Sequence, residues 1–164
     1  MATRSYIDVN PGQTAHLRST AATQTSNVIT ELPRGYAVDV LSSADPFKRV
    51  EVWDGMENIK GYVHRDCLST GKIACSDDDL YIPRYSTTSW KRANHYNKKN
   101  TPVLKIQKDL ISIGYTQVGK ADGYYGANTE TAVKAFQSAN GLTSDGVFGK
   151  ASKKKLWSLI DRKG

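Results

Sequence analysis

The chain has 164 residues, of which 38% are apolar and 24% charged, and a formal net charge of +7. This length suits one domain or two small ones. No apolar run approaches the roughly 18 residues that a membrane-spanning helix needs, and the start shows no apolar core of a signal peptide.

The excess positive charge lies in the second half of the chain. Residues 1–72 carry eight Lys or Arg and eight Asp or Glu, whereas residues 73–164 carry 15 basic and eight acidic residues. This asymmetry predicts two units with different surfaces. A basic surface attracts polyanions, and nucleic acid and the teichoic acids of a Gram-positive wall both qualify. A solvated basic face that aids solubility explains the charge equally well.

Residues 4–69 are predicted to form an all-β domain, because short apolar runs alternate with turn residues at regular intervals. The last two strands should form a hairpin around Asp54-Gly55. By the two-residue period of a strand, Tyr36, Val38 and Val40 should share one face. The expected strands are Ala15–Arg18, Asn27–Leu32, Tyr36–Leu41, Arg49–Trp53 and Lys60–His64.

The order of landmarks in this region resembles the bacterial SH3-like domain. Tyr62 stands where tryptophan is more frequent, and Met56–Ile59 lengthens the hairpin. The resemblance implies an SH3-like small barrel, a fold that binds wall peptides in some members and serves as a spacer in others. The matching landmarks are Leu17-Arg18, the loop Ser19–Ser26, Leu32–Gly35, Ala37–Leu41, Val50–Trp53 and Gly61–His64.

Residues 70–100 lack sustained periodicity and are predicted to be an aromatic, basic connector. Their aromatic content is too high for a disordered chain, so we expect them to pack over one or both domains. Exposed aromatic rings among cations could instead stack on sugars or nucleobases, and Trp90 is the candidate ligand-binding residue for that role. The apolar residues concerned are Tyr81, Ile82, Tyr85, Trp90 and Tyr96.

Two cysteines, Cys67 and Cys75, lie near the end of the predicted β domain. A disulfide between them would close a short loop, which suits an extracellular protein better than a reducing cytosol. Spacing alone does not decide whether the bridge forms.

Residues 101–162 are predicted to form an all-α three-helix bundle. Thr101 should be the N-cap of the first helix, with Pro102 at its first position, and Gly114 should end it. A second helix begins near Asn128 and a third near Lys150, with Lys153–Lys155 expected to face outward. The apolar stripes, at helical spacing, are Val103, Ile106, Leu110 and Ile113; Ala132, Val133 and Phe136; and Leu156, Leu159 and Ile160.

A short motif occurs twice in this region. Asp122–Gly126, with the sequence DGYYG, recurs 23 residues later as Asp145–Gly149, with the sequence DGVFG. In each copy Asp-Gly should form a tight turn, and the aromatic residue, Tyr125 or Phe148, should fill the core. The second glycine lets the backbone enter the following helix. The motif predicts one small domain with two equivalent helix entries.

This region resembles the peptidoglycan-binding-domain family found beside many wall hydrolases. Ile106 stands where the family has leucine, and Ser152 where it has threonine. The resemblance implies a helical fold and peptidoglycan as the partner. The matching segments, in the family's order and spacing, are Val103–Leu110, Gly114-Tyr115, Asp122–Gly126, Thr129–Gln137 and Gly141–Gly149.

Five polar residues of the helical region are candidates for ligand binding. Gln107, Gln137, Asn140 and Asp145 can hydrogen-bond the N-acetyl and hydroxyl groups of a glycan or the amides of a stem peptide. Tyr124, if exposed, could stack on a sugar ring. The alternative is that Gln137 and Asp145 only hold helix ends and turns.

No catalytic group, metal or cofactor is expected. His16, His64 and His95 are widely spaced and form no His-Glu-x-x-His zinc motif, and adding Cys67 and Cys75 gives no finger-like spacing. The sequence around Cys67 is similar to the nucleophile motif of NlpC-type peptidases but lacks the glycine that should follow. No carboxylate pair has a context that suggests glycoside hydrolysis.

The sequence therefore favours a non-catalytic bacterial cell-wall-binding protein, or the targeting module of a wall hydrolase such as a phage endolysin, located at the cell wall or outside the cell. Its expected partners are peptidoglycan, teichoic acid as a second wall ligand, and a hydrolase on another chain, but no nucleic acid. Two alternatives stay open. One is a small wall peptidase or amidase that uses Cys67 with His64 or His95, and the other is a structural protein of a spore coat or phage particle.

Overall fold

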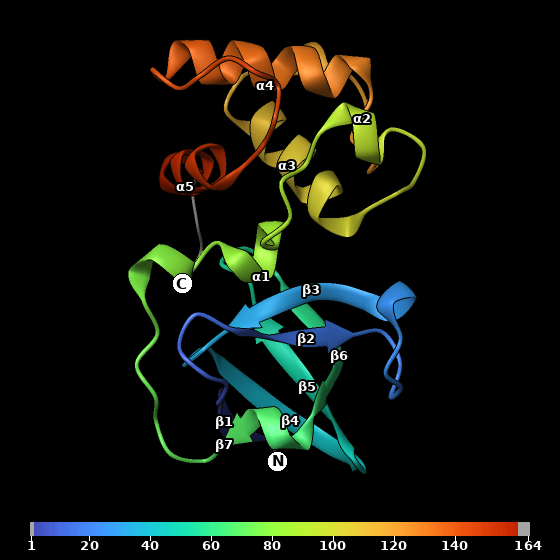
Figure 1. The fold of residues 1–164 in the computed structure, drawn as a ribbon, viewed down its shortest axis with the longest axis vertical. Coiled ribbons are helices and arrows are strands. Elements are labelled where there is room, and N and C mark those ends of the chain that lie inside the picture. The colour runs from blue at the N-terminus through green and yellow to red at the C-terminus, as the bar shows by residue number, and fades with distance from the viewer. Residues whose placement is uncertain (1, 161–164) are drawn as a thin grey trace. The chain divides into compact units, whose positions relative to one another are not determined.

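A computed structural model describes residues 2–160, which divide into two compact units (Figure 1). The first unit ends at Ser86 and the second begins at Thr87, so the boundary lies inside the predicted connector. The range Thr87–Asp161 holds twelve Lys or Arg and five Asp or Glu, so it accounts for the whole net charge of +7. The predicted combination of a β unit and a helical unit is confirmed.

The first unit is built on an antiparallel sheet of seven strands in the order β3-β2-β6-β5-β4-β1-β7. All five expected strands are present, and β1 and β7 are added. The sequence did not reveal β1 because only Ser5 and Ile7 of its five residues are buried, which leaves no apolar alternation. The strands are β1 Thr3–Ile7, β2 Thr14–Arg18, β3 Val28–Pro33, β4 Ala37–Ala44, β5 Phe47–Trp53, β6 Asn58–His64 and β7 Leu68–Ser69.

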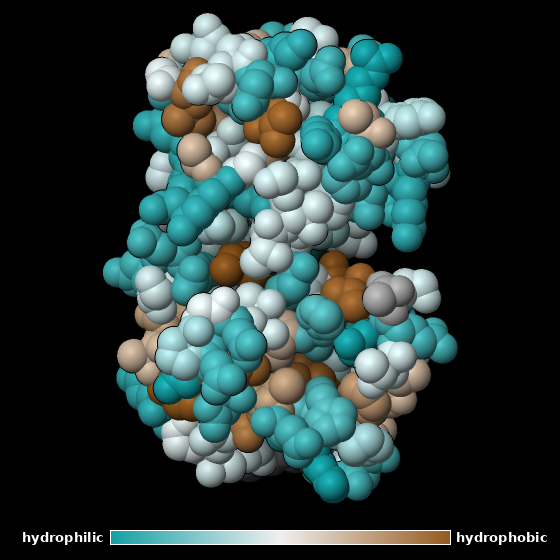
Figure 2. Space-filling model, viewed as in Figure 1, coloured by the Kyte–Doolittle hydropathy of each residue, from teal (hydrophilic) through white to brown (hydrophobic). Residues whose placement is uncertain are grey.

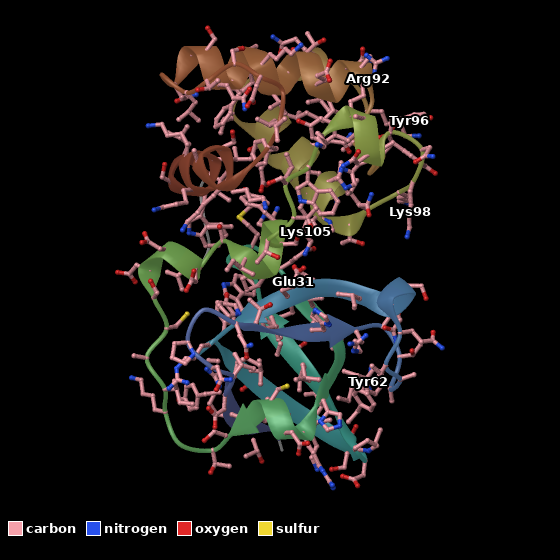
Figure 3. The ribbon with its side chains drawn as sticks, in the orientation of Figure 1. Glu31, Tyr62, Arg92, Tyr96, Lys98 and Lys105 are labelled. Atoms are coloured by element: carbon pink, nitrogen blue, oxygen red, sulfur yellow. The ribbon has the colours of Figure 1, made fainter. Side chains whose placement is uncertain are left out.

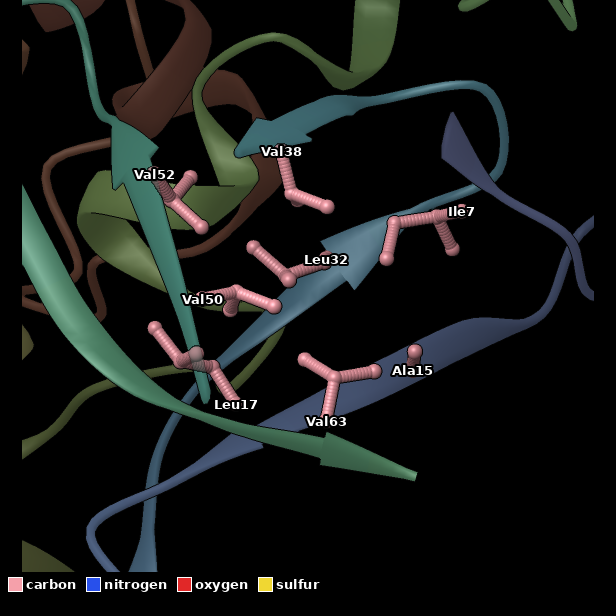
Figure 4. Close-up of a cluster of buried hydrophobic side chains, with 8 residues drawn as sticks. All are labelled: Ile7, Ala15, Leu17, Leu32, Val38, Val50, Val52 and Val63. Carbon is pink, nitrogen blue, oxygen red and sulfur yellow. The ribbon is translucent and has the colours of Figure 1, made fainter. Parts of the chain in front are cut away.

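Apolar side chains from six strands, β1 to β6, form the core (Figure 4). Alternate residues of β5, Val50 and Val52, are at most 1% exposed, as the two-residue period of a strand requires. Tyr36 and Val40 pack against the same cluster as Val38, in agreement with the predicted shared face. The core side chains are Ile7, Ala15, Leu17, Leu32, Val38, Val50, Val52 and Val63.

The chain after the sheet folds back onto it through α1, Ile82–Tyr85, whose four residues are all buried. The Thr30 hydroxyl of β3 donates to the Ile82 carbonyl at 3.1 Å. Arg84 and Asp54 form a buried ion pair at 2.9 Å. The other carboxylate oxygen of Asp54 accepts backbone N–H groups within its own hairpin turn. Three short 3₁₀ turns, Thr25–Asn27, Arg65–Cys67 and Asp77–Asp79, complete the unit.

The second unit contains the three predicted helices and one short additional helix. Within it, Figure 1 shows α4 lying across α3. The N-cap of α3 is Asn100 rather than Thr101, because Thr101 is already the first helical residue. The elements are α2 Arg92–His95, α3 Thr101–Ser112, the 3₁₀ turn η4 Thr116–Val118, α4 Ala127–Ala139 and α5 Lys150–Leu159.

Two expectations about α5 were wrong. Lys153, expected to face outward, is 1% exposed, and its ammonium donates to the Thr88 carbonyl. Leu159, expected to face inward, is 44% exposed. Lys153 shares a face with Leu156 and Ile160, so its long aliphatic chain passes through the apolar layer and places the charged end on a polar partner.

The described part of the chain, residues 2–160, has no helix long and apolar enough to span a bilayer. On the face shown in Figure 2, hydrophilic residues predominate and apolar ones occur in small, separated groups.

Candidate functional site

A buried glutamine holds the first DG turn of the helical unit. The amide nitrogen of Gln107 lies 3.1 Å from Asp122 Oδ1 and 2.9 Å from the Tyr124 carbonyl. The same nitrogen is 2.9 Å from the Thr129 hydroxyl in the first turn of α4. The amide oxygen of Gln107 accepts the Gly123 N–H at 2.8 Å. One side chain thus joins α3, the turn and α4.

Gln137 holds the second DG turn through the same four contacts. Its amide nitrogen lies 3.1 Å from Asp145 Oδ1 and 2.9 Å from the Val147 carbonyl. It is also 3.1 Å from the Ser152 hydroxyl in the first turn of α5. Its amide oxygen accepts the Gly146 N–H at 3.0 Å. The two copies of the motif therefore build two equivalent junctions, as the repeated sequence predicts.

Each junction has a hollow on its outer side. The first has a volume of about 330 Å³ and the second of about 430 Å³. In both, the floor is the buried glutamine and one wall is the first turn of a helix. The polar and aromatic side chains around them include Lys120, Asp122, Tyr124 and Asn128 for the first hollow, and Thr143, Asp145 and Lys150 for the second.

Backbone donors are available at the wall of each hollow. The N-caps of α4 and α5 are Gly126 and Gly149, and neither helix has a side-chain cap. The first N–H groups of an α-helix have no partner within the helix. Both hollows therefore offer amide N–H donors and the positive end of a helix dipole to a carbonyl or carboxylate.

The predicted ligand-binding residues differ in how accessible they are. Gln107 and Gln137 are 1% and 2% exposed, and their amides contact the turns. They therefore hold the turns that border the hollows and are not available to bind a ligand directly. Asp145 is exposed; its Oδ1 also accepts the Val147 N–H. No hydrogen bond to its Oδ2 occurs within residues 2–160. Tyr124 is 41% exposed and lines the first hollow, so it can stack on a ligand.

The other two predicted ligand-binding residues lie away from the hollows. Trp90 is 6% exposed, and its backbone pairs with Phe148 through two hydrogen bonds of 3.2 and 2.7 Å. Its indole ring packs edge-on against the His95 imidazole, so it presents no open face to a sugar. Asn140 is half-buried and donates to the Phe136 carbonyl at 2.8 Å, at the C-terminal end of α4.

Three residues of the junctions were not predicted as site residues from the sequence: Asp122, Thr129 and Ser152. The signal that identifies them is the 23-residue repeat itself, because it aligns Asp122 with Asp145 and Thr129 with Ser152. Each aligned pair makes the same contact with its glutamine.

Cationic residues gather beside the first junction. Arg92 and Lys98 lie on α2 and on the loop after it, near the 57% exposed Tyr96 (Figure 3). This segment is attached to the turn, because the Asn100 N–H donates to the Gly123 carbonyl at 2.9 Å and the Tyr125 N–H to the His95 carbonyl at 3.0 Å. Arg92 lies 3.9 Å from Glu130 Oε1, which offsets part of its charge, so Lys98 contributes most of the positive charge of the pair.

The thiols do not have the environment of a nucleophile. Cys67 and Cys75 are both free, so the bridge that their spacing left open is not formed. Burial, followed by the Asp66 carboxylate, raises the pKa of Cys67, and burial with Asp79 and Asp77 raises the pKa of Cys75 to about 11. A reactive cysteine instead needs a lowered pKa, because the thiolate is the nucleophile.

The histidines named in the enzyme hypothesis have local partners. His64 Nδ1 accepts the Asp66 N–H at 3.2 Å, and its ring packs edge-on against Phe47. His95 Nδ1 lies 3.1 Å from the Lys91 nitrogen, within its own helical turn. Across the described part of the chain, no three His, Cys, Asp or Glu side chains are grouped as a metal ion would require.

The segment that contains both junctions is similar in sequence to known proteins. Residues 99–156 match the family described as "Putative peptidoglycan binding domain". A probable N-acetylmuramoyl-L-alanine amidase of Bacillus licheniformis is 40% identical over 67 residues, and the N-acetylmuramoyl-L-alanine amidase CwlL of the same organism is 39% identical over 67. Each alignment covers 38% of this chain and only 19% of the relative. The match to this family therefore covers the helical region whose sequence resembles it, whereas the SH3-like identity of the first unit stays a prediction.

Proposed function

We propose that this chain is a non-catalytic cell-wall-binding protein, or the targeting part of a wall hydrolase, and that it holds peptidoglycan at the two hollows of its helical unit. The observation that carries the proposal is the pair of equivalent glutamine-held junctions within the segment that matches the peptidoglycan-binding family. The proposal places the protein at the cell wall.

The groups around each hollow suit the amides of a wall polymer. The first-turn N–H groups can donate to a carbonyl oxygen of an N-acetyl group or a peptide, and Asp122 or Asp145 can accept an N–H or hydroxyl from the same ligand. Tyr124 adds an aromatic face to the first hollow. Each hollow therefore offers donors and an acceptor to one ligand unit.

Two weak sites on one small domain suit a ligand that repeats. When one hollow is occupied, the second meets the next unit of the polymer at a high effective concentration. Binding to intact wall should therefore exceed binding to a short fragment that can occupy only one hollow.

The test is co-sedimentation of the full chain with purified sacculi. Asn128→Ala alters the first hollow and Lys150→Ala the second, and both side chains are exposed. We expect each single change to weaken binding about threefold and the double variant about tenfold. Ser138→Ala, exposed on α4 and outside both hollows, is the matched control and should bind as the unchanged chain does.

Absence of sedimentation with every wall preparation would disprove the proposal. Release of sugars or peptides from the sacculi, lost on Cys67→Ala, would support the enzyme hypothesis instead. A comparison of sacculi with and without teichoic acid separates the two wall ligands. Added salt should weaken the teichoic-acid contribution in particular, because exposed charges are screened over about 8 Å at physiological ionic strength.

A further inference from the structure

A second kind of hollow lies in the first unit, on the outer face of the sheet. It has a volume of about 440 Å³, within the range of about 300–1,000 Å³ typical of ligand pockets. Its floor consists of residues that alternate with the core residues and therefore point away from the core. Arg4 of β1 pairs with Asp39 of β4, and Asp39 with Glu51 of β5, in the strand register.

One wall of this groove is formed by the chain after β7. Residues 72–75 run beside the turn that contains Gly35, which also lines the groove. The contact is so close that a Cβ at Gly35 would lie 2.4 Å from the Ala74 carbonyl oxygen, and Gly35 has a φ of +82°. Because residue 35 is a glycine, residues 72–75 can pack closely against the sheet. The groove lies between this segment and the outer face of the sheet.

The groove has an aromatic, apolar lining. Trp53, at the end of β5, is 39% exposed. The Tyr36 hydroxyl donates to the Trp53 carbonyl at 2.7 Å, which fixes the phenol beside the end of that strand. Tyr6 of β1 also lines the groove, and Ile73 and Leu80 contribute aliphatic surface from the covering segment.

The charged groups of the groove are balanced. Two cations, Arg4 and Lys72, and two acids, Asp39 and Glu51, line it. Arg4 is joined to Asp39 at 2.6 Å, and Glu51 lies 4.0 Å from the Lys60 ammonium beside the groove. A groove without excess charge gives no electrostatic preference to a polyanion, in contrast to the basic helical unit. Paired charges around aromatic rings instead offer hydrogen-bond donors and acceptors beside flat apolar faces. An uncharged sugar needs this combination, because its C–H face stacks while its hydroxyls bond at the edge.

We propose that this groove is a second binding site, specific for an uncharged oligosaccharide that carries N-acetyl groups. The sugar ring stacks on Trp53, and the acetyl methyl group contacts the aliphatic side chains of Ile73 and Leu80. The site goes beyond the proposed function, because it lies outside the segment that matches the peptidoglycan-binding family.

The test uses the full chain and tetra-N-acetylchitotetraose as the probe, with cellotetraose as the control that lacks acetyl groups. The chain has three tryptophans, Trp53, Trp90 and Trp157, whose indole N–H signals can be followed by NMR. We expect the chitotetraose to shift the Trp53 signal and to leave the other two unchanged, with cellotetraose binding at least about fivefold more weakly.

Variants give an independent measurement. Trp53→Ala should weaken chitotetraose binding about tenfold or more, because exposed tryptophans in binding sites contribute strongly. Trp53→Phe keeps an aromatic ring, assigns the NMR signal and should retain part of the affinity. Leu41→Ala is the matched control, because Leu41 is 36% exposed on β4 but does not line the groove. Thermal unfolding of each variant checks that it is folded.

Several outcomes would overturn the proposal. They are equal binding of the two sugars, a shift at Trp90 or Trp157 without one at Trp53, and unchanged binding by folded Trp53→Ala. Tyr124→Ala separates this site from the hollows of the helical unit: it should leave the Trp53 response intact, whatever the sacculus assay shows.

Discussion

The two DG turns of the helical unit are held in the same way but carry different side chains. Gln107 and Gln137 make equivalent contacts with their turns and with the helices that follow. The second residue after each aspartate, however, is the exposed Tyr124 in one turn and the half-buried Val147 in the other. The aspartate and the glutamine of each junction are thus repeated, whereas the side chain two residues after the aspartate varies. The difference separates residues that build the turns from residues that could distinguish ligands.

The largest effect should come from removing a glutamine. Gln107→Ala and Gln137→Ala each leave a buried Gly N–H and other polar groups without their partner, and unsatisfied buried groups cost about 1–3 kcal/mol each. We expect each variant to lose about 2–4 kcal/mol of unfolding free energy, measured by urea denaturation.

Because the two networks match, the two losses should agree to within about 1 kcal/mol. Gln117→Ala, an exposed glutamine on η4, is the control and should change stability by less than about 0.5 kcal/mol. A much smaller loss for one of the buried glutamines would show that the turns are equivalent in geometry but not in energy.

An intermediate effect is expected where the turns differ in their core aromatic residue. Tyr125 is fully buried, and its hydroxyl donates to the Gly146 carbonyl at 2.7 Å, so it ties the first turn to the second. Phe148, its counterpart, has no hydroxyl. Tyr125→Phe should therefore cost about 1–2 kcal/mol at neutral pH, as one buried hydrogen bond is lost.

The same substitution should also change the response to alkali. Burial, followed by Glu130 and Asp145, raises the pKa of Tyr125 in the folded state. The stability linked to the neutral phenol is complete below the ordinary tyrosine pKa of about 10 and is lost as the pH rises above it. The unfolding free energy of the unchanged protein should fall above that pH, and that of Tyr125→Phe should fall less steeply. Parallel curves would contradict this account.

The sequence predicted local structure better than it predicted contacts. The repeated motif located both turns and the starts of α4 and α5, because Asp-Gly and a second glycine constrain the backbone locally. The pairing of each glutamine with its turn could not be found in this way. Gln107 precedes Asp122 by 15 residues, whereas Gln137 precedes Asp145 by only 8, so the two contacts lie outside the repeat.

In the first unit, long-range pairing limited the prediction in the same way. Strand β1 has few apolar residues and is recognisable only through its partners β4 and β7. Arg84 belongs to the segment predicted to be a basic connector, yet it is buried against Asp54, 30 residues earlier. A charged side chain gives no sequence signal that its partner lies in a distant hairpin. The groove beside Trp53 depends on the same kind of contact, between Gly35 and Ala74.

The smallest effect should appear at the positions that face the hollows. Tyr124→Ala removes an exposed ring that lines the first hollow, so unfolding free energy should change by less than about 0.5 kcal/mol. Binding to sacculi should nevertheless weaken about threefold, because stacking on the ligand is lost while the second hollow still binds. Val147→Ala, the matched change in the second hollow, removes no aromatic face and should weaken binding less. If Val147→Ala has the larger effect, the second hollow is the stronger site, and the aromatic residue of the first turn does not determine affinity.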